Sequence, residues 1–153
     1  MPKGFNMRSL AGESEVEAYV KLHQAVFETK NMTTGWRTRT LKHPGYKSGL
    51  DVVVVDPDGK LVAFCIGWLS QSTDGKTIGQ IEPLGCHPAF RNYALGRVAL
   101  CETLWRLQQH GAESIFVETD NYRNTAFRLY ESVGFEVIRD VLVYHKDYND
   151  TVG

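Results

Sequence analysis

One stretch of the chain, residues 81–97, combines residue types that could bind a phosphate group. Its loop, residues 91–97, carries two arginines and no acidic residue. The loop leads into a helical pattern, and the first N–H groups of a helix lack partners within it and carry partial positive charge. The residues that would surround the anion are Arg91, Asn92, Tyr93, Ala94, Leu95, Gly96 and Arg97. Many turns of this kind bind nothing, so a loop without a ligand remains the alternative.

The strand expected just before this loop, residues 77–86, contains Pro83. Proline has no N–H to donate to a neighbouring strand, so Pro83 predicts a bulge or a strand that parts from its neighbour. A parted strand would leave N–H and C=O groups free, and an extended ligand with amide groups could pair with them. Glu82 shares a strand face with Leu84 by alternation. Its carboxylate could be a structural group bonded at the bulge, and a chemical role is an equally favoured alternative.

The elements that must position these residues are those of a single domain, residues 1–153, because a chain of this length suits one core. Apolar patterns and turn residues predict strands over 5–10, 51–55, 61–69, 77–86, 114–119, 135–139 and 141–145. A long helix over 95–110 would make a right-handed crossover between parallel strands. We therefore expect an α/β (α+β) fold, a mixed, mostly antiparallel twisted sheet of roughly six to seven strands with about four helices packed on it.

Two further helices are expected between the first and second strands. Ser14, with Glu17 three residues later, has the pattern of a capping box, and apolar residues follow at helical spacing as far as residue 27. His23 lies on this apolar stripe, where a packed histidine is favoured over a catalytic one. Thr33 or its neighbour would cap the second, shorter helix.

Composition and charge exclude several classes of protein. The formal net charge is −1, so no broad basic surface points to nucleic acid. A local basic cluster of Arg37, Arg39 and Lys42 is best explained as a solvated face. The apolar runs are too short to span a bilayer and the N-terminus lacks the pattern of a signal peptide. We expect a cytoplasmic protein that does not contact membranes.

The chain has three cysteines, Cys65, Cys86 and Cys101, each within an apolar segment. Their number is odd, and no pair has the spacing of metal ligands. We therefore expect buried free thiols in a reducing compartment and no metal site. The helix over 95–110 should bury Cys101 together with Trp105.

Two segments resemble motifs of one enzyme superfamily. Arg91-x-x-Ala94-x-Gly96 resembles the pyrophosphate motif Q/R-x-x-G-x-G/A of the GNAT N-acetyltransferases, and residues 81–88 resemble their fourth strand. Residues 126–135 closely resemble the segment A-x-x-L-Y-e-x-x-G-F of the same superfamily. Two motifs in the right order are more specific than either alone. The residue match covers residues 78–146, and the order of elements resembles the GNAT fold over nearly the whole chain.

The resemblance implies that acetyl-CoA is a cosubstrate and that an amine attacks its thioester directly. Tyr130 matches the general acid of the superfamily, which protonates the departing thiolate, and Glu82 lies where a base could act. Leu84 and Cys86 would pair with the pantetheine arm through their backbone. Besides the loop residues, the implied contacts to acetyl-CoA are Leu84, Gly85, Cys86, Asn124 and Tyr130.

The superfamily usually has glycine where this chain has Ala94. A negative φ at this residue would tolerate the alanine, whereas a required positive φ would weaken binding of the cosubstrate. The alanine and a linker-like opening over residues 2–5 keep one alternative open. The chain would then be a non-catalytic acyl-CoA-binding domain or half of a tandem GNAT protein.

The resemblance also places an amine acceptor against the first two helices and the last hairpin. The candidate acceptor residues are Phe27, Met32, Trp36, Arg37 and Tyr144. Trp36 and Arg37 could hold an aromatic or acidic acceptor, or could be packing and surface residues. We expect a small-molecule amine, with a protein lysine or N-terminus in an open groove as the alternative. Many members of the superfamily are dimers, and the apolar edge strand expected over 141–145 is a candidate dimer contact.

Overall fold

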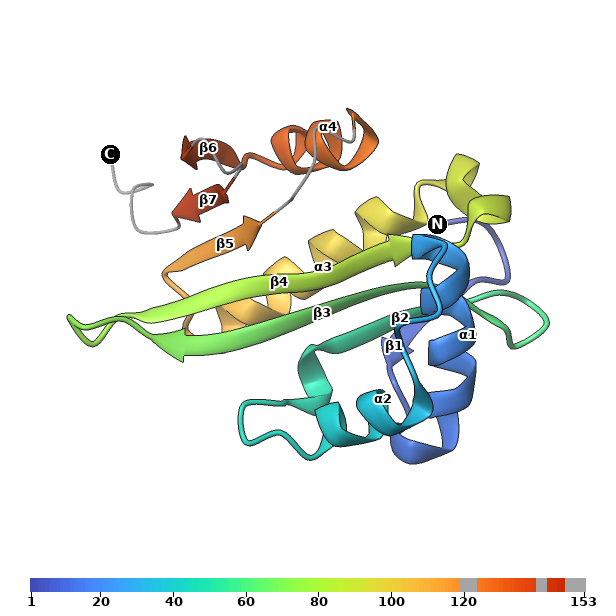
Figure 1. Cartoon of the computed structure of the whole chain (residues 1–153). Helices are drawn as coiled ribbons and strands as arrows, with labels where there is room; N and C mark the ends of the chain where they lie inside the picture. The colour runs from blue at the N-terminus through green and yellow to red at the C-terminus, as the bar shows by residue number, and fades with distance from the viewer. Residues whose placement is uncertain (119–123, 140–142, 148–153) are drawn as a thin grey trace.

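The computed structural model describes residues 1–118, 124–139 and 143–147. Within them seven strands form one sheet: β1 (Asn6–Ser9), β2 (Asp51–Val55), β3 (Leu61–Gln71), β4 (Thr77–Cys86), β5 (Ser114–Glu118), β6 (Glu136–Arg139) and β7 (Val143–Asp147). Four α-helices accompany the sheet within the same residues: α1 (Val16–Phe27), α2 (Thr34–Leu41), α3 (Leu95–Gln109) and α4 (Asn124–Ser132) (Figure 1). The predicted fold class is therefore confirmed.

The strand order is β1-β2-β3-β4-β5-β7-β6, and all neighbouring pairs are antiparallel except β4 and β5. The parallel pairing joins residues 78–80 of β4 to residues 114–116 of β5, after which the described residues show no further pairing between them. Strand β4 continues to Cys86, and Figure 1 shows β5 diverging from it. The parted strand predicted from Pro83 is confirmed.

A bulge also occurs at the proline. Cys65 lies opposite Leu84, and Gly67 lies opposite Ile81, so Glu82 and Pro83 together oppose a single residue of β3. The indole Nε1 of Trp68 donates a hydrogen bond of 2.8 Å to the carbonyl oxygen of Glu82. The bulge is therefore bonded to a side chain of β3. At the bulge, β4 has one residue more than the segment of β3 that it faces.

The extra residue changes which side chains share a face of β4. Ile81 and Leu84 both pack on the core under α3, although they are three positions apart. Glu82 lines a cavity on the opposite face, with Tyr19 and Ile66 of the core under α1. The prediction that Glu82 and Leu84 share a face is wrong, because simple alternation does not survive a bulge.

The sheet separates two cores. The core under α3 contains the buried face of that helix, Leu95, Ala99, Leu100, Leu104 and Leu107, together with Tyr130 of α4. The core under α1 contains Tyr19, Leu22 and Val26 with Phe64 of β3. Gly85 sets the distance between α1 and β4, since a Cβ there would lie 2.6 Å from Val26 Cγ1 and 2.7 Å from Phe64 Cζ. Helix α1 can approach β4 this closely only because residue 85 has no side chain.

The two helix starts on this face differ. Thr33 caps α2 as predicted, its hydroxyl accepting the N–H of Trp36 at 3.1 Å. The capping box predicted at Ser14 is wrong, because Ser14 lies in a 3-10 turn, Gly12–Glu15, and α1 begins at Val16 without a side-chain cap. The carboxylate of Glu15 instead accepts the Ala11 N–H at 2.7 Å and pairs with Arg8.

Three surface assignments are also corrected. Strand β7 lies between β5 and β6, so the strand expected over 141–145 is not an edge, and β6 is the edge of the sheet instead. Cys101 and Trp105 are exposed, because the buried residues of α3 lie on another face of the helix.

No helix within the described part of the chain is long and apolar enough to cross a membrane.

Candidate active site

The end of β4 presents backbone groups on the side from which β5 has departed. His87 N donates to Val62 O at 2.8 Å, so these two opposed residues form a bonded pair of the antiparallel ladder. Bonded and non-bonded pairs alternate along such a ladder. Cys86 and Leu84 therefore belong to non-bonded pairs, and their N–H and C=O groups point away from β3. This is the free edge that an extended amide ligand would need.

The loop after β4 ends in the N-terminus of a long helix. A 3-10 turn, Pro88–Tyr93, is followed by Ala94 with φ of 57°, and α3 starts without a side-chain cap. The first N–H that bonds back into the helix is that of Val98, to Ala94 O at 3.1 Å. A residue in the left-handed region after a right-handed turn is also the geometry of an anion-binding nest. Ala94 thus adopts the positive φ that, from the sequence, would weaken cosubstrate binding.

Two arginines flank this helix start. Arg91 donates from Nε to Cys86 O at 3.3 Å and from Nη2 to Val26 O at 3.5 Å. Arg97 donates to Ser132 Oγ at 2.6 Å. Both side chains are exposed, and neither forms an ion pair with any residue that the structure describes. Their positive charges are therefore not neutralised by a carboxylate.

The remaining loop residues differ in their surroundings. Tyr93 and Phe90 form an aromatic cluster with Phe5, with ring centroids 5.9 to 6.1 Å apart, which fixes the loop against the N-terminal segment. Asn92 is exposed. A Cβ added to Gly96 would lie 3.9 Å from the Cys86 Cβ, an ordinary contact, so packing within the chain does not require a glycine there.

The residues predicted near the second motif lie on α4, and the acceptor candidate of the last hairpin lies on β7. Tyr130 is 7% exposed, and its ring packs edge-on against Phe135 at a centroid distance of 5.7 Å. Asn124 is the first residue of α4, and Tyr144 of β7 lies opposite Val117 of β5. The side chains of Asn124 and Tyr144 lie outside the described part of the structure.

A cavity of about 280 Å³ lies on the other side of β4, between the sheet and the first two helices. Its walls are formed by side chains from α1, α2, the segment between them, β3 and β4: Tyr19, His23, Asn31, Met32, Trp36, Arg37, Thr40, Ile66, Trp68, Glu82 and Pro83. The structure thus brings Met32, Trp36 and Arg37 together as expected for an acceptor site. Phe27 instead packs behind His23 and is not part of the wall.

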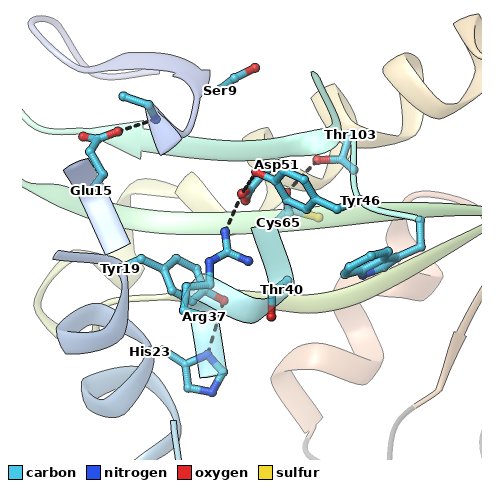
Figure 2. A network of polar contacts seen from close by, with 12 residues as sticks. Ser9, Glu15, Tyr19, His23, Arg37, Thr40, Tyr46, Asp51, Cys65 and Thr103 are labelled. Atoms are coloured by element: carbon cyan, nitrogen blue, oxygen red, sulfur yellow. Dashed lines mark hydrogen bonds and ion pairs between the residues drawn. The ribbon is translucent and has the colours of Figure 1, made fainter. Parts of the chain in front are cut away.

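Arg37 closes the inner end of this cavity as part of a buried ion pair. Its side chain is 1% exposed, and Nη2 pairs with the carboxylate of Asp51, which also accepts the hydroxyl of Tyr46. The guanidinium carbon lies 3.9 Å from the centroid of the Tyr19 ring (Figure 2). Arg37 is therefore not part of a solvated basic face, so that interpretation is wrong for Arg37, whereas Arg39 and Lys42 are exposed as expected. Asp51 neutralises its charge within the protein interior.

His23 was assigned to packing from the sequence, and the structure places it in the cavity wall. Its Nδ1 lies 3.3 Å from the Tyr19 hydroxyl (Figure 2). Its ring stacks on Phe64 with a centroid distance of 5.8 Å. Burial, and then the charge of Arg37, lower the pKa of His23 below its usual value. His23 is consequently a neutral, half-buried base facing the cavity.

Glu82 is the exposed carboxylate of the same wall, and it accepts a hydrogen bond of 3.4 Å from the side-chain amide of Gln80. Cys86 is a poor candidate for a nucleophile, because burial raises the pKa of its thiol above the usual value. Among the described residues, no group of three or more histidine, cysteine or acidic side chains is placed to hold a metal ion.

Comparison with known families gives a direct match. Residues 14–135 match the sequence model of the family described as Acetyltransferase (GNAT) family. The matched region includes the cavity walls, the end of β4, the loop before α3, and α4.

Among curated proteins, the chain is 27% identical over 143 residues to mycothiol acetyltransferase of Thermobispora bispora, covering 88% of this chain and 48% of that protein. The chain thus spans about half the length of the curated relatives it matches. Among solved structures, the ribosomal-protein-S18-alanine N-acetyltransferase of Escherichia coli superposes with a TM-score of 0.71 at 19% identity, over 92% of this chain and 89% of that one. The PaiA N-acetyltransferase of Thermoplasma acidophilum, solved with coenzyme A, gives a TM-score of 0.73 at 14% identity, over 94% and 99%.

Proposed function

Because the chain belongs to the acetyltransferase (GNAT) family, we propose that residues 1–153 form one domain that transfers the acetyl group of acetyl-CoA to a primary amine of a small molecule. The observation that carries this proposal is the position of β4 between two sites. One face of the bulge at Glu82 and Pro83 lines a cavity, and the following residues of the same strand present a free backbone edge. A donor on that edge and an acceptor in the cavity would meet at β4.

Acetyl-CoA is a substrate here, and the residues present fit it. Leu84 offers its N–H and C=O groups to the amide-bearing arm, and Cys86 offers its N–H, with Gly85 between them. The Cys86 carbonyl is already bonded to Arg91. The uncapped start of α3 offers N–H groups to its phosphates, with Arg91 and Arg97 supplying full positive charges. Asn124, at the start of α4, would contact the arm from the opposite side of the gap.

Acetyl-CoA supplies an acetyl thioester, and this chain's residues move the protons. The acceptor nitrogen forms a bond to the acetyl carbon as the carbon–sulfur bond breaks. Tyr130 donates the proton that the departing sulfur requires; a phenol and a thiol have ordinary pKa values of about 10 and 8.5, so this hydroxyl must act through its position. Glu82, exposed in the cavity wall, draws the ammonium form of the acceptor toward β4.

The form of the acceptor site supports a small molecule over a protein substrate. The cavity of about 280 Å³ is near the lower end of the range of small-ligand sites. Its walls come from five segments that meet around one partly open hollow, whereas a peptide would need an extended groove. The matched relatives are named for an acetyltransferase of a small molecule, mycothiol, which supports the same class of acceptor.

One observation supports a second candidate function, an acyl-CoA-binding domain without turnover. Ala94, in the loop that would hold the phosphates, occupies the left-handed region, where a Cβ is strained. If the strained loop holds the cosubstrate out of the position that transfer requires, the domain would bind acyl-CoA and would not catalyse transfer.

Calorimetric titration of acetyl-CoA, followed by a thiol-release assay over a panel of small primary amines, tests the proposal. We expect one site per chain and thiol release with at least one amine whose size fits the cavity. Binding without release from any amine or peptide would favour the second candidate. Release with N-terminal peptides but not with small amines would overturn the small-molecule assignment.

A further inference from the structure

The imidazole of His23 is held in a single orientation in the acceptor cavity. Its ring lies parallel to that of Phe64, with an interplanar angle of 9°, and Phe27 packs against it at a centroid distance of 4.7 Å. The Tyr19 hydroxyl, one helical turn earlier on α1, contacts Nδ1 at 3.3 Å. Two ring contacts and one hydrogen bond at Nδ1 therefore fix the position of the imidazole.

The second ring nitrogen is left for a ligand. No residue in the described part of the chain forms a hydrogen bond with Nε2 of His23, although the side chain lines the cavity. When Nδ1 carries the hydrogen and donates it to the Tyr19 oxygen, Nε2 holds a lone pair. The hydroxyl of Tyr19 can accept this bond in both the neutral and the protonated state of the ring.

The charges around His23 favour its neutral form. On α2, Arg37 lies over the Tyr19 ring, and its positive charge opposes protonation of the imidazole. Asp51 on β2 neutralises part of this charge, and Glu82 on β4 places a carboxylate in the same cavity wall. The pKa of the Tyr19 phenol is raised, chiefly by burial, so its hydroxyl stays protonated at any working pH. His23 is therefore a base that is unprotonated at rest and has charges nearby that bind an ammonium ion.

We propose that His23 is the general base of the acetyl transfer, accepting at Nε2 the proton of the acceptor ammonium group, with Tyr19 as its positioning residue. This inference rests on the proposed function and assigns a base to its acceptor site. The proton leaves the nitrogen of the amine and forms an Nε2–H bond, while Nδ1–H donates to the Tyr19 oxygen. The freed nitrogen lone pair attacks the acetyl carbon, and the carbon–sulfur bond breaks. The imidazolium returns its proton to water at the cavity mouth. The second proton of the attacking nitrogen leaves as the amide forms and, through water, restores the proton that Tyr130 gives to the sulfur. Glu82 attracts the ammonium ion and is not the group that takes its proton.

The resting state of His23 can be measured in the free protein, without any substrate. We expect nitrogen-15 NMR of the imidazole to show the tautomer with hydrogen on Nδ1, titrating at a pH below that of an unperturbed histidine. Tyr19→Phe should convert this into a mixture of tautomers, because the partner of Nδ1 is removed. A tautomer with hydrogen on Nε2 in the native protein would overturn the proposal.

The pH profile of kcat/KM separates a base from a structural histidine. With an amine of pKa about 10, native enzyme should show a flat profile between about pH 7 and 9, because the base is neutral and the amine is taken as its ammonium form. His23→Gln should lower kcat/KM by about 100-fold at pH 7. Its rate should then rise about tenfold per pH unit, since only the free amine can react. Glu82→Gln should raise KM and keep the flat profile.

The matched control is His110→Gln, which removes an exposed histidine at the end of α3, on the other face of the sheet. It should leave both the rate and the flat profile unchanged. Titration with acetyl-CoA should give the native affinity in His23→Gln, which shows that the variant is folded. A flat profile in His23→Gln, with native donor affinity, would overturn the role of His23 and leave the proposed function standing. Absence of turnover by native protein that binds acetyl-CoA would overturn both.

Discussion

The two halves of the candidate site are built in different ways. The donor half consists of backbone groups at the end of β4 and the start of α3, joined by a short exposed loop. The acceptor half consists of side chains from α1, α2, β3 and β4 around a buried ion pair. The donor half should therefore depend on backbone conformation and surface charge, and the acceptor half on individual buried side chains.

The largest effect is expected from the acceptor half, at the ion pair beneath the cavity. Asp51→Asn leaves the buried guanidinium of Arg37 without its counter-charge, which should cost about 3–5 kcal/mol of unfolding free energy. Urea denaturation followed by circular dichroism measures this. The double variant Asp51→Leu with Arg37→Met removes both charges and should recover most of the loss. A loss below about 1 kcal/mol in Asp51→Asn would show that solvent reaches the pair.

In the donor half, reversing a surface charge should affect binding and spare stability. Arg91→Glu should weaken acetyl-CoA binding by about 1.5–3 kcal/mol, or roughly 10- to 150-fold, because it replaces a cation beside the phosphates with an anion. Calorimetric titration gives the affinity, and thermal melting should be nearly unchanged because the side chain is exposed. Lys21→Glu, an exposed charge reversal on α1, is the matched control and should bind normally. Unchanged affinity in Arg91→Glu would remove the loop from the donor site.

Alanine substitutions at two glycines of the donor half should have different effects, one on the stability of the fold and the other on acetyl-CoA binding. Gly85→Ala places a Cβ 2.6 Å from Val26 Cγ1 and should destabilise the fold by about 1–3 kcal/mol. Gly96→Ala meets nothing closer than 3.9 Å and should leave the melting temperature at or above the native value, while weakening acetyl-CoA binding. Thermal melting and titration of the same two proteins make the comparison. If Gly96→Ala binds normally, the backbone at this position does not approach the phosphates.

The smallest effect is expected where the donor half departs from its motif. Ala94→Gly relieves about 1–2 kcal/mol of left-handed strain but adds about 0.4–1 kcal/mol of chain entropy to the unfolded state. The net gain in stability should be under about 1.5 kcal/mol, accompanied by tighter acetyl-CoA binding. Glu28→Gly, at the other non-glycine residue of positive φ among the described residues, should gain similar stability without changing affinity. Equal affinities in the native protein and Ala94→Gly would contradict a cost of the alanine to binding.

The donor half could be predicted from the sequence because its recognition groups are contiguous. Pro83 indicated both the parting of β4 and the bulge, and the loop between Arg91 and Arg97 lies before α3 as expected. Backbone recognition needs only a strand, a turn and a helix start, and all three have local signals. The value of φ at Ala94 was the missing quantity, since the sequence allowed either sign.

The acceptor half was predicted only in part, because its members come from distant segments. Trp36 and Arg37 were candidates, but nothing local indicated that Arg37 would be buried against Asp51. His23 lies on an apolar stripe, and its contact with the cavity arises only when α1 packs on β3. The face occupied by Glu82 was mispredicted for a related reason, since the bulge shifts every later side chain of β4 by one place.

The free edge of β4 has a consequence for hydrogen exchange. The amides of Gly85 and His87 belong to bonded pairs with β3, whereas those of Leu84 and Cys86 point into the gap beside β5. Exchange of a bonded amide requires local opening of the sheet, and exchange of an unbonded one does not. Four consecutive residues should therefore alternate between fast and slow exchange in the free protein. Binding of a ligand in the donor site would slow hydrogen exchange of the two fast amides and leave exchange of the slow pair unchanged. Exchange at these four residues would therefore report whether the site is occupied.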